Sequence, residues 1–141
     1  MSFDLELINN DVAIKSDHKI RTVTDTPKLR QDIIKLILTP LGSVKVHRWY
    51  GCAVNEIIGQ LLSEDFQLNR IRACVTQGLD RLQALQISQS SSQKVSLAEL
   101  LNTIGEITAE RDTVDARKIN IIITVYSKRL SKIEELFTLI S

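Results

Sequence analysis

The chain is poor in the residue types on which many catalytic sites are built. Its 141 residues include only two histidines, two cysteines and five glycines. They contain no G-x-G-x-x-G sequence, no phosphate-binding glycine loop and no G-x-S-x-G sequence. We therefore expect no nucleotide cofactor and no nucleophile of the G-x-S-x-G type.

The chain also lacks an excess of charge and a long hydrophobic run. Lysine and arginine number 18 against 17 for aspartate and glutamate, so the positive charge that drives non-specific nucleic-acid binding is missing. The longest apolar run is Ile121 to Ile123, whereas a membrane span needs about 18 residues. With no secretory signal pattern at Met1 to Glu6, these features predict a soluble cytosolic protein that binds neither nucleic acid nor membrane.

The chain also has few histidines and cysteines for a metal site or a reactive thiol. His18 and His47 lie far apart, each beside a lysine or arginine, whereas a zinc site needs three or four ligands. Cys52 and Cys74 form no C-x-x-C pair and lie among aliphatic neighbours on predicted helices. We expect both to be free thiols that fill the core, because a chain of this length buries a core without disulfides or metals.

The scarcity of aromatic residues counts against a sugar-binding cleft. The chain has one Trp, two Tyr and three Phe. Glycoside hydrolysis requires two carboxyl groups about 5–9.5 Å apart, one of them a general acid. The candidates by residue type lie on predicted polar faces without aromatic neighbours: Glu56, Glu64, Asp65, Glu106 and Glu110. We therefore expect no catalytic residue, no metal site and no enzymatic activity.

What the first half of the chain does contain is periodic hydrophobicity. Apolar and polar residues alternate on both sides of Asn9-Asn10, which predicts a β-hairpin over residues 3–14. A short extended piece follows at 19–24. Apolar residues then recur at helical spacing in three segments, which predicts amphipathic helices at 26–38, 52–62 and 65–86.

The first predicted helix begins at Thr26-Pro27, a good cap and first helical residue. Thr39-Pro40-Leu41-Gly42 ends it, because the residue before proline is disfavoured in the helical conformation and this sequence suits a turn. Val44 and Val46 then predict a short extended segment that ends at Trp49.

The second half begins with the serine- and glutamine-rich residues 88–95, whose composition predicts a flexible linker. Ser96 and Glu99 form a capping-box pattern, which predicts a short helix at 96–102. Apolar–polar alternation predicts two strands, at 106–110 and 119–125, joined by a turn at 112–117.

The last segment, residues 131–140, carries conflicting signals. Its apolar residues fit helical spacing, and Ser131 with Glu134 forms a second capping-box pattern. As a strand it alternates poorly. The local pattern alone therefore favours a helix.

Together these elements predict one α+β domain over residues 1–141. It has an N-terminal β-hairpin, three amphipathic helices and a C-terminal antiparallel β-sheet. Residues 1–87 supply the hairpin and the helical half, 88–95 the linker, and 96–141 the short helix and the β-rich half.

Trp49-Tyr50-Gly51 is the most suggestive local feature, because two aromatics adjoin in a chain that has few. Two interpretations stay open: a core anchor whose glycine permits a tight entry into the next helix, or an interface anchor. Arg70, Arg72 and Arg81 lie on the third predicted helix. Three interpretations of these arginines stay open: a solvated helix face, ion pairs at an interface, or a basic strip that binds phosphate.

Several short motifs follow one another in a recognisable order. They are Asp4-Leu5 with Asn10-Asp11-Val12, Leu29 to Ile33, Leu38 to Gly42, Trp49 to Val54, Leu79 to Gln86 and Leu97 to Leu101. This order resembles the baseplate wedge proteins, or sheath initiators, of contractile phage tails and related injection systems. In place of that family's Glu-Pro-Arg motif the chain has Asp80-Arg81-Leu82, which keeps the arginine.

The resemblance implies a structural role in the baseplate of a virion tail that is assembled in the host cytoplasm. Its implied partners are a larger wedge subunit, the tail sheath protein, and tube or hub proteins. It also implies a strand at 131–140, which we adopt against the local helical pattern. The predicted partner-binding residues are Trp49, Tyr50, Arg81, Ile119, Ile121 and Ile123.

Two other functions stay open. Some members of that family are labelled lysozyme-like, which would make the protein a cell-wall glycan hydrolase. No catalytic carboxylate pair can be carried over onto this sequence to support that activity. A free-standing cytosolic adaptor of the same fold is the other alternative, and it would be a stable monomer outside any tail.

Overall fold

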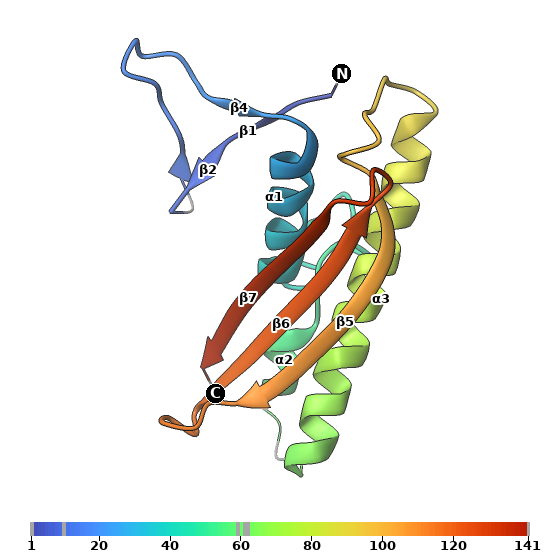
Figure 1. Ribbon diagram of the computed structural model, residues 1–141. Coiled ribbons are helices and arrows are strands. Elements are labelled where there is room, and N and C mark those ends of the chain that lie inside the picture. The colour runs from blue at the N-terminus through green and yellow to red at the C-terminus, as the bar shows by residue number, and fades with distance from the viewer. Residues whose placement is uncertain (1, 10, 59, 61–62, 141) are drawn as a thin grey trace.

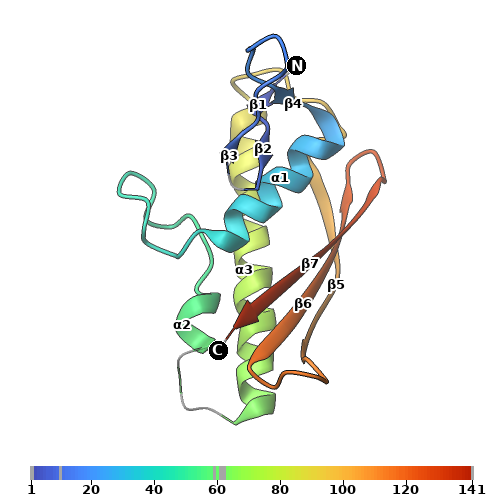
Figure 2. The ribbon, with the colours of Figure 1, turned by 90° about the vertical axis from the view of Figure 1, so that its left-hand side faces the viewer.

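The computed structural model describes residues 2–9, 11–58, 60 and 63–140, and it has the predicted α+β architecture. A three-stranded antiparallel sheet of order β5-β6-β7 lies against a layer of helices (Figures 1 and 2). The N-terminal segment projects from one end of this body (Figure 1). We call its described residues up to Thr24 the arm.

The arm consists of two small sheets. β2 (Leu7–Ile8) pairs with β3 (Asp11–Val12), which confirms the inner part of the predicted hairpin, whereas β1 (Asp4–Leu5) pairs with β4 (Thr22–Val23) outside it. Asn9 has a φ of 53° in the hairpin turn, a conformation that asparagine tolerates, and Asn10 lies outside the described residues. Most large apolar side chains of the arm are exposed: Phe3, Leu5, Leu7, Ile8, Val12, Ile14 and Ile20. Hydrophobic burial therefore contributes little to its attachment.

α1 (Asp25–Leu38) confirms the first predicted helix, with Thr24 rather than Thr26 as the extended residue before it. Its buried face follows the predicted spacing, as at Leu29, Ile33 and Leu36. The turn after it lies one residue later than predicted. The Ser43 N–H donates to Pro40 O at 3.1 Å, and Gly42 has a φ of 81°, which glycine adopts without strain.

The short extended segment predicted at Val44 and Val46 is wrong. Residues 43–50 form a loop whose backbone bonds are local, such as Tyr50 N–H to His47 O at 2.9 Å. No described strand pairs with this loop, and Val46 is 82% exposed. A strand here would leave its backbone groups without a ladder, so turns satisfy them instead.

α2 (Val54–Ile58) is shorter than the predicted 52–62, and Leu61 and Leu62 lie outside the described residues. Cys52 precedes this helix, contrary to expectation, and its N–H donates to Thr39 O at 2.9 Å. It is nevertheless 1% exposed, which confirms it as a core residue.

α3 (Glu64–Ser90) is longer than predicted, so the expected linker loses its first three residues to the helix. Serine hydroxyls bind the last carbonyls of the helix: Ser90 Oγ donates to Ile87 O and Ser91 Oγ to Ser88 O, both at 2.7 Å. The end of a helix leaves these carbonyls without helical partners. The serines that predicted flexibility therefore stabilise the helix end.

The short helix predicted at 96–102 is wrong, although half of its capping box forms. The Ser96 N–H donates to Glu99 Oε1 at 2.5 Å, and residues 97–100 make turns. β5 begins at Leu101, whose N–H donates to Gln86 Oε1 of α3 at 2.8 Å. Pairing with distant residues therefore outweighs the local helix signal.

The sheet contains β5 (Leu101–Arg111), β6 (Lys118–Ser127) and β7 (Lys132–Ile140). The two predicted strands, the turn between them and the strand adopted at 131–140 are confirmed. The register between β5 and β6 shifts twice, once between Ile104 and Ile107. Gly105 lies in this shift, where a Cβ would come within 2.9 Å of Thr124 O.

One buried cluster joins the helices and the sheet. Alternate residues of β6 point into it and are at most 1% exposed: Ile119, Ile121, Ile123 and Val125. The helices cover this face of the sheet, and the opposite face is open (Figure 2). Among the helices of the described part, none has the length and apolar character needed to cross a membrane.

Candidate functional site

The β5 edge of the sheet is occupied by polar side chains of α3. Arg72 Nη2 donates to Ala109 O at 3.0 Å, and Gln83 Nε2 donates to Leu101 O at 3.2 Å and Asn102 O at 2.9 Å. Gln86 Oε1 accepts the N–H of Leu101. An unpaired strand edge is a template for association with other strands, and α3 covers this edge at Leu101, Asn102 and Ala109, with a hollow at Thr103 to Ile107 between them.

The β7 edge has no such cover. The Ser127 N–H donates to Ser131 O at 3.0 Å, and the β6–β7 register continues from this pair without a shift. Because bonded and non-bonded pairs alternate in an antiparallel ladder, the backbone groups of the even-numbered β7 residues point away from β6. In the described part of the chain, the N–H groups of Glu134, Leu136 and Thr138 have no partner.

A partly exposed stripe of α1 lies beside this open edge. Arg30 forms an ion pair with Glu135, on the inner face of β7, and Ile34 and Leu38 follow Arg30 at helical spacing. Leu38 is 49% exposed, and both apolar residues line a groove between α1 and the arm. α1 extends beyond the outer edge of β7 (Figure 1).

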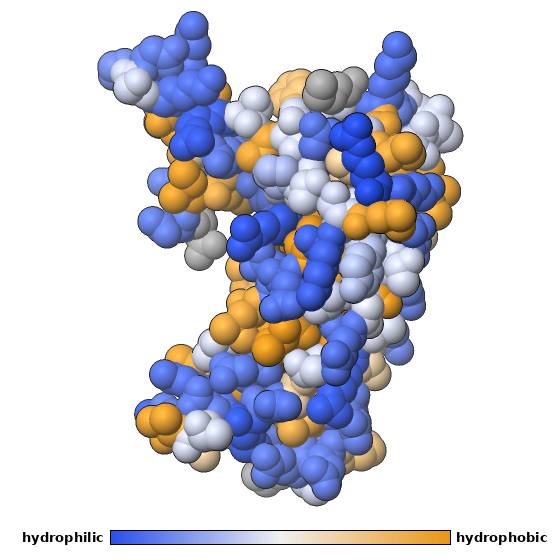
Figure 3. All heavy atoms as spheres, viewed as in Figure 1, coloured by the Kyte–Doolittle hydropathy of each residue, from blue (hydrophilic) through white to orange (hydrophobic). Residues whose placement is uncertain are grey.

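The surface is hollowed on this side of the molecule. Figure 3 shows a notch on the side of β7, between the arm above and the far end of the sheet below, with apolar surface along parts of its walls. An additional strand beside β7 would lie in this notch. Its inward side chains would then face the apolar stripe of α1.

A second surface brings together two predicted partner-binding residues. Trp49 and Arg81 line one hollow of about 330 Å³ with Ala84, Leu85 and Ser88, and we call it the Trp49 hollow. Trp49 is 41% exposed and makes an edge contact with Tyr50, with ring centroids 6.2 Å apart. Trp49 is thus a surface residue, whereas Tyr50 packs against the buried cluster and a Cβ on Gly51 would lie 2.6 Å from Thr39 O, as the core-anchor interpretation expects.

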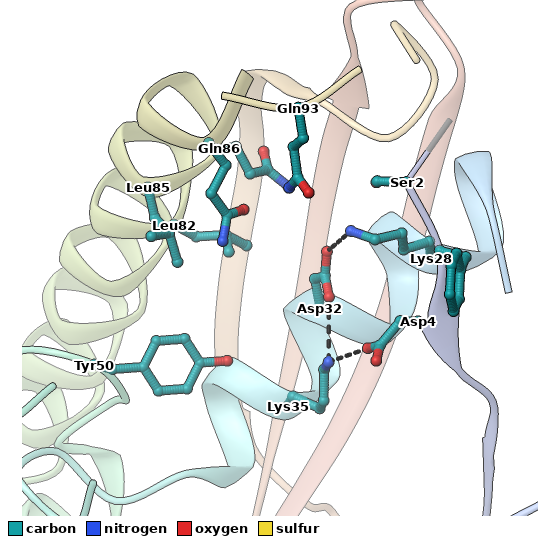
Figure 4. A pocket seen from close by; sticks show the side chains of 12 residues that line it. Ser2, Asp4, Lys28, Asp32, Lys35, Tyr50, Leu82, Leu85, Gln86 and Gln93 are labelled. Carbon is teal, nitrogen blue, oxygen red and sulfur yellow. Dashed lines mark hydrogen bonds and ion pairs between the residues drawn. The ribbon is translucent and has the colours of Figure 1, made fainter. Parts of the chain in front are cut away.

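Tyr50 points the other way, into a polar pocket between α1, α3 and the start of the arm (Figure 4). Lys35 Nζ lies 3.4 Å from Asp32 Oδ1 and also pairs with Asp4. Lys28 Nζ lies 3.0 Å from Asp32 Oδ2. The lysines of this pocket are therefore bound by its own carboxylates.

The charges of the pocket stabilise one another. Burial opposes ionisation of Asp4, but the hydrogen bond and charge of Lys35 outweigh it and lower the pKa of Asp4. Burial likewise opposes the charge of Lys35, and Asp4 and Asp32 together raise its pKa. Burial raises the pKa of the Tyr50 hydroxyl. A general acid needs a raised carboxyl pKa, so Asp4 is suited to an ion pair and not to acid catalysis.

Polar contacts also hold the arm at two further points. Gln31 of α1 accepts the Leu7 N–H at 2.9 Å and donates to Leu5 O at 2.8 Å. The Ser2 hydroxyl donates at 2.6 Å to Glu99, whose side chain is fully buried. The polar pocket and these contacts therefore fix the arm to the body.

The structure corrects the predicted role of the β6 isoleucines. Ile119, Ile121 and Ile123 are at most 1% exposed and belong to the core, so their side chains are not available to a partner. Alternation showed that one face of the strand is apolar. It did not show that the protein's own helices cover that face.

The carboxylates considered for hydrolysis lie on the surface of three different elements. Glu56, Glu64, Asp65, Glu106 and Glu110 are all exposed, on α2, α3 and β5. In the described part of the chain, no three His, Cys, Asp or Glu side chains gather as metal ligands. Burial raises the pKa of the Cys52 thiol to about 11 and also raises that of Cys74, which disfavours the reactive thiolates.

Sequence reasoning missed the residues that distinguish the two edges. Arg72 was noted only as a possible surface cation, and Gln83 and Gln86 were not singled out. A cluster of glutamines on the sheet-facing side of a long helix is the signal that could have indicated them. Their carbonyl partners lie on a distant strand, and pattern analysis of the helix alone does not reveal them.

Comparison with known proteins gives a likeness of fold. No family model matches the chain, and no curated protein matches it in sequence. The fold is similar to the crystal structure of a "putative tail lysozyme" from Geobacter sulfurreducens, with a TM-score of 0.55. The two chains are 13% identical, and the match covers 79% of this chain and 86% of the other. The chain therefore has the α+β fold of that Geobacter protein.

Proposed function

We propose that the protein is a structural component of a contractile tail, located in the baseplate, where it accepts a strand of the first sheath subunits. The observation that carries this proposal is the open β7 edge, opposite a β5 edge that α3 side chains cover in part. The order of motifs and the name of the Geobacter protein support the tail context.

Strand addition at β7 follows from ordinary sheet chemistry. An incoming strand would bond to the outward N–H and C=O groups of Glu134, Leu136 and Thr138, which gives affinity without a particular side chain. Its alternate side chains would pack over Ile34 and Leu38, which gives specificity for apolar residues at those positions. Burial of that stripe adds about 25 cal/mol for each Å² of apolar surface removed from water.

The Trp49 hollow is the surface that we assign to the larger wedge subunit. Tryptophan and arginine are the residue types most enriched at binding hot spots. The loop that carries Trp49 projects from the side of the helices opposite the sheet (Figure 2). Two partners could therefore bind at the same time.

The proposal is tested by sheath nucleation with a proline variant. In Leu136→Pro the proline removes an outward N–H and leaves the β6–β7 ladder bonds in place. We expect nucleation of sheath polymers, counted by electron microscopy, to fall about tenfold or more. Leu136→Ala is the matched control, because it removes the side chain and keeps the N–H. Normal nucleation by a folded Leu136→Pro variant would contradict the proposal.

Glycan hydrolysis is the second candidate function, favoured by the name of the Geobacter protein. The exposed, scattered carboxylates and the lysine-bound Asp4 argue for a non-enzymatic protein. We expect no product above buffer when the purified protein is incubated with peptidoglycan. Turnover that Glu56→Gln or Glu64→Gln abolishes, with the fold intact, would establish the hydrolase instead.

A free-standing adaptor is distinguished by where the protein is found. A baseplate component co-purifies with tail particles, whereas an adaptor stays in the soluble fraction as a monomer. Sedimentation of tail particles followed by detection of this chain separates the two functions.

A further inference from the structure

The Trp49 hollow combines an apolar floor with a cationic rim. Ala84 and Leu85 of α3 supply apolar surface opposite the Trp49 ring, and Arg81 borders it. The Trp49 ring contacts two neighbouring rings, with ring centroids 5.4 Å apart for His47 and 6.2 Å apart for Tyr50. The hollow thus presents apolar side chains and an aromatic ring to a partner.

The Arg81 side chain is held by a hydrogen bond, but its charge is not balanced by an ion pair between described residues. Its Nε donates to Gln77 O at 3.2 Å, which directs the guanidinium along α3. None of the ion pairs between described residues includes Arg81. Its remaining N–H donors are therefore available to a carboxylate from outside, which a guanidinium binds in a two-pronged geometry.

The loop that carries Trp49 adds positive charge and no negative charge. Residues 39–55 contain Lys45 and Arg48 but no aspartate or glutamate. Arg48 directly precedes Trp49 in a turn closed by the Tyr50 N–H and His47 O, and both cations are exposed. The chain as a whole carries a net charge of only +1, so this segment is a local concentration of cations.

We infer that the Trp49 hollow binds an acidic segment of a partner protein, in which a large apolar side chain is flanked by aspartate or glutamate. The apolar side chain enters the hollow, and one carboxylate pairs with Arg81. Further carboxylates face Arg48 and Lys45, where rim charges accelerate and orient the encounter. This inference rests on the proposed function in taking the hollow as the surface for the larger subunit.

The experiment uses the single tryptophan of the chain, because its fluorescence and its indole N–H resonance report on this site alone. The probes are synthetic peptides with a central Leu-Leu flanked on both sides by Asp-Glu. A second peptide replaces the acidic residues by lysine, and a third replaces the leucines by serine. We expect the acidic Leu-Leu peptide to shift the Trp49 signals in a saturable way and to bind about tenfold more tightly than either relative.

Charge reversal gives the matched test in the protein. Arg81→Glu should weaken the acidic peptide about tenfold and strengthen the lysine peptide, while Arg129→Glu, in the exposed β6–β7 turn, should change neither. Arg81→Gln keeps the stem and a polar end, and should give an intermediate loss if the charge-reversed variant does not fold. Equal binding of the acidic and lysine peptides, or indifference to both Arg81 variants, would overturn the inference. A stronger Trp49 response to an oligothymidine probe would also overturn it, in favour of nucleic acid.

The outcome is separable from that of the proposed function. The peptide titrations need no sheath protein, and sheath nucleation through β7 needs no acidic peptide. Failure of the titrations with normal sheath nucleation overturns only the acidic-partner inference. Loss of the nucleation difference between Leu136→Pro and Leu136→Ala overturns the proposed function instead.

Discussion

Along β5, side chains of α3 bind backbone groups of Leu101, Asn102 and Ala109, whereas along β7 the outward N–H groups of Glu134, Leu136 and Thr138 have no partner in the described part of the chain. Both strands belong to one sheet with one buried face. An open edge is an aggregation hazard that proteins usually block. Strand addition at β7, as proposed, would cover the open edge as well.

The largest expected effect comes from breaking the sheet that both edges share. Ile121→Ala should lower the free energy of unfolding by about 2–5 kcal/mol, because it leaves a cavity on the fully buried face of β6. Ile122→Ala, one residue further and 39% exposed, should cost about 1 kcal/mol or less. Urea unfolding measures both. Equal costs would mean that the assignment of the two faces is wrong.

A smaller effect is expected from opening the closed edge. Gln83→Ala removes the donor to Leu101 O and Asn102 O, and should cost about 0.5–1.5 kcal/mol. Together with Arg72→Ala it should also promote self-association, measured by light scattering, because β5 then resembles β7. Gln77→Ala, exposed on the same helix, is the control and should do neither. A double variant that stays monomeric would remove the distinction between the edges.

The smallest effect concerns how the arm is attached to the body. The pKa of Asp4 is lowered from 3.8, so its contribution is present above that value and is lost as the pH falls through the folded pKa. The pKa of Lys35 is raised from 10.5, so its contribution is complete below that value and is lost as the pH rises through the folded pKa. Acid should therefore lower the protection of the Leu7 N–H, which Gln31 binds, when its exchange rate is compared with the intrinsic rate at the same pH.

Two aspartate variants, one at the ion pair and one away from it, test the cause of this pH effect. Asp4→Asn should loosen the arm already at neutral pH and flatten the acid dependence, with little change in the unfolding of the body. Asp11→Asn, in the exposed hairpin, should leave both unchanged. An arm that exchanges at the same rate in all three proteins would show that other contacts hold it.

The strands show what the sequence could and could not predict. Apolar residues at every second position of β6 indicated both the strand and its buried face. In β7 the alternation is broken, because Leu136 and Ile140 point outward and Glu135 points inward to Arg30. The ion pair that makes an inward glutamate acceptable joins residues far apart in the sequence. Local analysis therefore favoured a helix, and only the resemblance indicated the strand.

The candidate sites show the same contrast between local sequence patterns and contacts of distant residues. The rarity of aromatics was enough to single out Trp49, but nothing near it in the sequence indicated Arg81 as its neighbour in the hollow. The capping pattern of Ser96 and Glu99 is real as a hydrogen bond, and β5 pairing still prevents the helix. Local residues thus identify candidates, and contacts between distant elements decide their role.

Residue-resolved amide exchange of β7, in the isolated protein and with purified sheath protein, tests the central claim most directly. In the isolated protein we expect slow exchange at Ile133, Glu135 and Phe137, whose N–H groups face β6, and fast exchange at Leu136 and Thr138. Sheath protein should slow exchange at Leu136 and Thr138. Protection of these two amides in the isolated protein, or their continued fast exchange in the complex, would contradict strand addition at this edge.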